Sequence, residues 1–176
     1  MSKAVMLSIR PKWVEKIANG EKTIEVRKTK PKLETPFKCY IYCTLPKREH
    51  EDFIRTDYPK PQFYGGGKVV GEFTCDRIYE LAPLNHAPDD VERQACLTRE
   101  EIVQYLKGIG YGWHISALLI YDHSRELTEF RRACPNSWYC ESCAMYWENN
   151  GTCGNESLYI KRPPRSWCYV EAMEDV

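Results

Sequence analysis

A short charged segment that follows a glycine carries the residues best suited to chemistry. The segment GEKTIEVRK, residues 20–28, places Lys22, Glu25 and Arg27 close together, and a second arginine, Arg10, directly follows an apolar run. Two arginines, a lysine and a carboxylate that meet in space would bind a ligand with phosphate groups and hydrogen-bonding edges. The alternative is that the three charges line the solvent face of a strand, where pairing contributes well under ~1 kcal/mol.

The pattern around these residues predicts a strand, a short helix and a second strand. Residues 4–9 form an apolar run that an Arg-Pro pair ends, as expected for a buried strand. Residues 12–20 have apolar side chains at helical spacing and a terminating Asn-Gly pair. Residues 23–28 alternate, so Glu25 and Arg27 share one face. The helix would return the chain so that the charged ends of both strands meet.

The rest of the chain adds several strands and one clear helix. Thr98 and Glu101 have the spacing of a capping box at the start of a helix within residues 97–110. We expect further strands at residues 37–45, 65–81 with a bend near Gly71, 113–122 and 162–170, and a surface loop at residues 46–64. This irregular order of strands and helices predicts an α+β fold, a small mixed, mainly antiparallel barrel.

Four cysteines near the end of the chain form a second candidate site. Cys134, Cys140, Cys143 and Cys153 follow a C-x5-C-x2-C-x9-C pattern. Two thiolates at C-x2-C spacing chelate one ion, and two more cysteines complete a closed tetrahedral Zn²⁺ site. The segment has few aliphatic residues, so metal binding worth on the order of 10 kcal/mol would fold it. The pattern predicts a structural zinc site; the alternative is a loop with free thiols.

Composition limits the class of protein. The chain has 25 basic and 25 acidic residues, so it lacks the overall field that drives indiscriminate binding to nucleic acid. The basic residues gather towards the N-terminus, with nine basic and four acidic residues in residues 1–35. The first residues resemble neither a signal peptide nor a membrane span, so we expect a cytoplasmic protein with reduced thiols and no membrane partner. Most of the five cysteines outside the four-cysteine pattern are expected to be small buried hydrophobes.

The charged segment also carries a family resemblance. GEKTIEVR matches the G-x-K-x-x-E-x-R signature of the ASCH domain, the activating signal cointegrator homology family of PUA-like barrels. The lead-in MLSIRPKWVEKIANG and the ending KRPPRSWCYV are also similar to that family. The resemblance implies a small β-barrel with flanking helices and a cleft lined by Lys22, Glu25 and Arg27, which binds RNA or a nucleotide. It further implies one domain over residues 1–176, with a Cys-rich insert at about residues 132–158.

PUA-like relatives often stack an aromatic side chain on a base, a contact worth roughly 1–3 kcal/mol. The candidates in this sequence are Trp113, Tyr111 and Trp167, of which we favour Trp113. Each of them is also suited to core packing, and for Trp167 the core is the better interpretation. The predicted ligand-binding set is therefore Arg10, Lys22, Glu25, Arg27 and Trp113.

An enzymatic alternative comes from the same family. Some small bacterial ASCH proteins that resemble this chain hydrolyse N4-acetylcytidine with a lysine, a threonine and a glutamate. Lys22 matches the lysine, but Glu25 occupies the position of the threonine; Thr23 lies nearby, and only a loose alignment offers Glu92 as the glutamate. The catalytic set under this alternative would be Lys22, Thr23 and Glu25. A carboxylate beside a lysine raises the pKa of the amine, which disfavours a lysine base.

Binding of RNA or of a modified nucleoside or nucleotide is thus the main prediction, and amidohydrolysis is the alternative. A third alternative is a protein-interaction module, in which the Cys-rich insert binds a protein partner.

Overall fold

The computed structural model describes residues 3–45, 53–56, 62–81, 87–134, 137–151 and 153–173. Most of the loop predicted at residues 46–64 lies outside the described residues. Two short strands, β4 (Phe53–Arg55) and β5 (Gln62–Tyr64), pair antiparallel within it, so the prediction of a loop is wrong for these two stretches.

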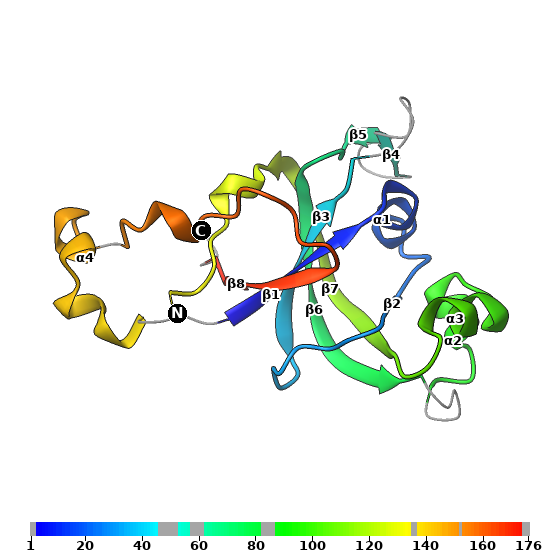
Figure 1. Cartoon of the computed structure of the whole chain (residues 1–176). Helices are drawn as coiled ribbons and strands as arrows, with labels where there is room; N and C mark the ends of the chain where they lie inside the picture. The colour runs from blue at the N-terminus through cyan, green and yellow to red at the C-terminus, as the bar shows by residue number, and fades with distance from the viewer. Residues whose placement is uncertain are drawn as a thin grey trace.

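Six strands form one curled sheet (Figure 1). Its order is β2-β7-β6-β3-β1-β8, which makes β2 and β8 the edge strands. The strands are β1 (Lys3–Ile9), β2 (Ile24–Arg27), β3 (Phe37–Cys43), β6 (Val69–Glu80), β7 (Tyr111–Arg125) and β8 (Trp167–Glu171). Only β1 and β3 pair in parallel; the other pairs in the sheet are antiparallel. The predicted fold class, α+β with a mixed, mainly antiparallel PUA-like barrel, is confirmed.

The curl depends on the long β6–β7 pair. Its register shifts between Val69 and Gly71, where the sequence predicts a bend. A Cβ at Gly71 would lie 2.4 Å from the carbonyl oxygen of Leu119, closer than any side chain can approach. Glycine therefore lets β7 approach β6 at this point, and the sheet bends around an apolar interior.

Short helices cover the ends of the sheet (Figure 1). Helix α1 (Pro11–Ala18) starts directly after β1 and buries Val14 and Ile17. Helix α2 (Val91–Ala95) and helix α3 (Arg99–Leu106) pack apolar side chains against β2. The capping box of α3 is confirmed, because Thr98 accepts from the Glu101 amide and the Glu101 side chain accepts from the Thr98 amide. In the described residues, no helix is long and apolar enough to cross a membrane.

The described residues of the Cys-rich insert, residues 132–158, have little core. They include the 3₁₀ turns η3 (Ser137–Ser142) and η4 (Glu156–Leu158) and the helix α4 (Ala144–Glu148), which buries no residue. Figure 1 shows α4 projecting away from the sheet, on the side opposite α2 and α3. The insert is anchored at its ends, where Leu158 joins Phe130 and Ile160 in a buried cluster against the sheet.

Candidate functional site

The three charges of the signature segment meet inside the protein. Gly20, at a φ of 72°, ends the turn that follows α1, and the chain then enters β2. Lys22, Glu25 and Arg27 are only 2%, 6% and 6% exposed. Glu25 Oε1 lies 2.9 Å from Arg27 Nη2, and Glu25 Oε2 lies 3.5 Å from Lys22 Nζ. We refer to these three side chains as the buried ion cluster. The solvent-face alternative for them is therefore wrong.

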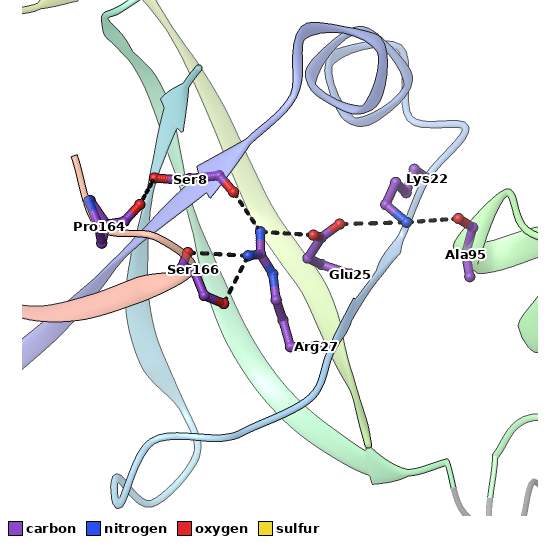
Figure 2. A network of polar contacts seen from close by, with 7 residues as sticks. All are labelled: Ser8, Lys22, Glu25, Arg27, Ala95, Pro164 and Ser166. Atoms are coloured by element: carbon purple, nitrogen blue, oxygen red, sulfur yellow. Dashed lines mark hydrogen bonds and ion pairs between the residues drawn. The ribbon is translucent and has the colours of Figure 1, made fainter. Parts of the chain in front are cut away.

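Arg27 links the two edges of the sheet. From β2, its Nη1 donates to the backbone oxygen of Ser166, at 3.1 Å, and to its hydroxyl oxygen, at 3.2 Å, just before β8 (Figure 2). Its Nη2 donates to the backbone oxygen of Ser8 on β1, at 2.9 Å. With Glu25, these acceptors occupy both terminal nitrogens; Nε is buried and has no hydrogen-bond partner in the part of the chain that the structure describes. The guanidinium therefore links the two edges of the curled sheet, which we call the seam: β2 on one side and the start of β8 on the other.

Lys22 is held from a different direction. Its Nζ donates to the backbone oxygen of Ala95 at the end of α2, at 2.7 Å (Figure 2). The same atom lies 5.1 Å from the ring centroid of Trp13. Both oxygens of Glu25 are thus engaged, one by each cation. Two cations and one carboxylate leave the cluster with a net positive charge. Removing one partner from such a buried group leaves an uncompensated charge, which is strongly destabilising.

A cavity of about 400 Å³ opens over this cluster. Its lining residues are Ser8, Ile9, Arg10, Trp13, Lys22, Glu25, Val26, Arg27, Thr44, Leu97, Glu101, Tyr105 and Arg165. The structure therefore brings Arg10, Lys22, Glu25 and Arg27 to one cavity. Their role in binding stays a prediction.

Sequence reasoning missed several side chains on the cavity wall. Trp13 and Tyr105 supply aromatic rings, Arg165 supplies an exposed cation, and Glu101 supplies a carboxylate. The sequence predicts Glu101 only as a cap of α3. One signal was available for Trp13: it lies three positions after Arg10, at the start of the predicted helix. No local pattern marks Tyr105 or Arg165, since both reach the cavity through tertiary packing.

The structure does not place Trp113 at the cavity. Trp113 is 0% exposed, and its ring packs 5.8 Å from that of Phe37 and 5.9 Å from that of Trp167. It lies opposite Glu25 in the β2–β7 pair, so the two side chains are on the same face of the sheet. Tyr111 and Trp167 do not line the cavity either. The aromatic rings that a ligand in the cavity can reach are those of Trp13 and Tyr105.

Two residues of the hydrolase alternative also lie elsewhere. The hydroxyl of Thr23 donates to Gln94 Oε1, at 3.2 Å, and Thr23 does not line the cavity. Glu92 is exposed, and its carboxylate accepts from the Arg99 amide at 2.7 Å, next to the start of α3. Neither residue lines the cavity.

The cysteines of the insert do not form a metal centre in this structure. Among the described residues, which include Cys134, Cys140, Cys143 and Cys153, no group of three or more His, Cys, Asp or Glu side chains is placed to hold a metal ion. Burial, and then the thiols of the other three cysteines, raise the pKa of Cys140. The arrangement of the described side chains therefore does not support a zinc site, and zinc binding by these cysteines stays a prediction.

Comparisons with known proteins agree with the fold. A family model described as the ASCH domain matches residues 7–146. No curated protein matches the sequence. Among solved structures, the crystal structure of ASCH from Zymomonas mobilis is 14% identical, with a TM-score of 0.51, over 96% of this chain and 87% of that chain. A mutant of the same Zymomonas mobilis protein is also 14% identical, with a TM-score of 0.52, over 97% of this chain and 91% of that chain.

Proposed function

The chain belongs to the ASCH domain family, whose PUA-like fold is generally RNA-binding, and on that premise we propose that the cavity binds RNA or a nucleotide-like ligand. The observation that carries the proposal is the division of charge in the cavity. The cations at the base are buried and paired with Glu25, whereas Arg10 and Arg165 are exposed and have no ion pair with a described carboxylate. The cavity thus has a fixed floor and two free cations at its opening.

Each wall residue then has a distinct role. Arg10 and Arg165 bind phosphate oxygens, for which the planar guanidinium is well suited. Trp13 and Tyr105 offer ring surfaces on which a base stacks. Glu101 accepts from an exocyclic amine of the base. Arg27 and Glu25 act indirectly, because the protein already occupies most of their hydrogen-bonding atoms.

Hydrolysis of N4-acetylcytidine is the competing function, and the geometry favours binding over it. The hydroxyl of Thr23 faces Gln94 instead of the cavity, and Glu25 is held between two cations. Neither group is arranged to attack an amide carbonyl beside Lys22. Incubation with N4-acetylcytidine tests this directly: we expect no release of acetate above a buffer control. Release that Lys22→Ala abolishes would replace the binding proposal with the enzymatic one.

Binding is tested by fluorescence anisotropy with a 5′-labelled single-stranded RNA of mixed sequence, and by competition with mononucleotides. We expect Arg10→Ala and Arg165→Ala each to weaken binding about 10- to 100-fold, because a charge-assisted hydrogen bond contributes roughly 1.5–3 kcal/mol. Lys3→Ala is the control: it removes one positive charge at the far end of β1. Unchanged affinity in both arginine variants, or an equal loss in the Lys3 variant, would contradict the proposal.

A further inference from the structure

We infer that the ligand is a single-stranded polynucleotide that continues beyond the cavity over a track of three lysine–aromatic pairs. This inference rests on the proposed function and extends it from a nucleotide-sized ligand to a strand. The pairs are Lys12 with Trp13, Lys28 with Tyr105, and Lys30 with Tyr111. We call them the lysine track.

In each pair, a lysine ammonium lies over an aromatic ring. The distances from Nζ to the ring centroid are 4.7 Å for Lys12, 5.2 Å for Lys28 and 4.9 Å for Lys30. The three lysines are exposed, and none forms an ion pair with a carboxylate in the described residues. Their charges are therefore available to an outside anion.

The pairs are arranged from the cavity outwards. Trp13 and Tyr105 line the cavity, so their lysines lie at its rim. Tyr111 does not line it; in the β2–β7 pair it lies opposite Arg27, the last residue of β2. Lys30 over Tyr111 consequently adds positive charge outside the residues that line the cavity, where a ligand confined to the cavity would not reach.

The segment that carries two of these lysines is fastened to the protein. Lys28 and Lys30 belong to the connection between β2 and β3, residues 28–36. The indole of Trp167 donates to the Thr29 hydroxyl at 2.9 Å, and the Lys32 amide donates to the Tyr169 hydroxyl at 2.7 Å. Both partners lie on β8. Because the connection is held at two points, a ligand that binds there loses little free energy to ordering it.

Interleaved cations and rings suit a single strand better than the other polyanions. The lysines neutralise successive phosphates, and partly exposed rings accept unstacked bases. Tyr105 keeps 46% of its surface exposed although Lys28 lies over it. A base-paired duplex stacks its bases on one another and would leave such rings unused. The only carboxylate among the cavity-lining residues outside the buried ion cluster is that of Glu101, so the field at the rim is positive.

The test compares ligands of increasing length on the intact chain. We expect an octamer of single-stranded RNA to bind at least 10-fold more tightly than a mononucleotide. The variant Lys30→Glu should lose much of that advantage and keep the affinity for the mononucleotide. The plot of log K for the octamer against log salt should become shallower by about 0.7, since each phosphate contact in a single strand contributes about 0.7. Lys3→Glu is the matched control and should change neither quantity.

Several outcomes would overturn the inference. An octamer that binds no more tightly than a mononucleotide would do so, while the proposed function would stand. A duplex of the same length, or an octamer of glutamate, that binds as tightly as the single strand would also overturn it. Failure of both the octamer and the mononucleotide to bind would overturn the proposed function as well.

Discussion

The cavity and the Cys-rich insert are opposites in how their polar and reactive side chains are held. Lys22, Glu25 and Arg27 are at most 6% exposed, and hydrogen bonds tie them to α2, β1 and the segment before β8. In the insert, Met145 and Trp147 are 49% and 66% exposed, and α4 buries nothing. Residue type alone would have suggested the reverse, charges outside and aromatics inside. The difference shows that hydrogen bonds to distant backbone oxygens, rather than side-chain polarity alone, decide which side chains are buried.

Thiol reactivity should show the largest contrast between the two regions. Burial raises the pKa of Cys39 well above its usual value and that of Cys75 to about 12, whereas the four insert cysteines are partly exposed. Treated with a thiol reagent at pH 8 after dialysis against a chelator, the insert cysteines should react at least about 1,000-fold faster, because the barrel thiols react only on unfolding. Peptide mass spectrometry measures both rates. Equal rates would show that the barrel is as open as the insert.

The same thiols test the zinc prediction. Elemental analysis of the untreated protein would find one equivalent of zinc per chain if the four cysteines bind it, and Cys140→Ser would remove that zinc. Protein without zinc would leave the insert as the free-thiol loop of the alternative.

Substitution within the buried ion cluster should give a large change in stability. Glu25→Gln keeps the shape of the side chain but leaves Lys22 and Arg27 buried without a counter-charge. We expect the free energy of unfolding to fall by about 3–5 kcal/mol, measured by urea denaturation. Glu156→Gln, an exposed position in the insert, is the control and should change it by less than about 0.5 kcal/mol. A loss below 1 kcal/mol for Glu25→Gln would mean that the cluster is not structural.

Arg27→Lys should have a smaller but localised effect. A lysine keeps the charge, but its single ammonium cannot reach Ser8, Ser166 and Glu25 together, so we expect a loss of about 2–3 kcal/mol. Hydrogen exchange shows where the structure is weakened: the amides of β8 should exchange faster in the variant, while the exchange rates of the α4 amides should not change. If β8 is unaffected, Arg27 does not fasten the seam.

The smallest effect is expected in the insert. Trp147→Ala removes a large side chain that is 66% exposed, so the free energy of unfolding should change by less than about 0.5 kcal/mol. Its matched substitution is Trp113→Ala in the core, which should cost about 3–5 kcal/mol. A large loss for Trp147→Ala would mean that the insert contributes to the core, and the contrast between the two regions would fail.

Features that depend on neighbours in the sequence were predictable. The capping box of α3, the bend at Gly71 and the shared face of Glu25 and Arg27 each follow from spacing alone. Features that depend on distant segments were not. Arg27 bonds to Ser166, which is 139 positions away, and no local pattern indicates that contact. For the same reason an aromatic residue in a strand, such as Trp113, cannot be assigned to core or ligand from its sequence.

The most direct test of the account is an NMR titration that observes tryptophan indole N–H signals while single-stranded RNA is added. Trp13 lies on the cavity wall, Trp147 lies exposed on α4, and Trp113 is a buried reference. We expect the Trp13 signal to shift with saturable dependence on RNA and the Trp147 signal to stay in place. A shift of Trp147 with Trp13 unchanged would place binding on the insert and contradict the central claim.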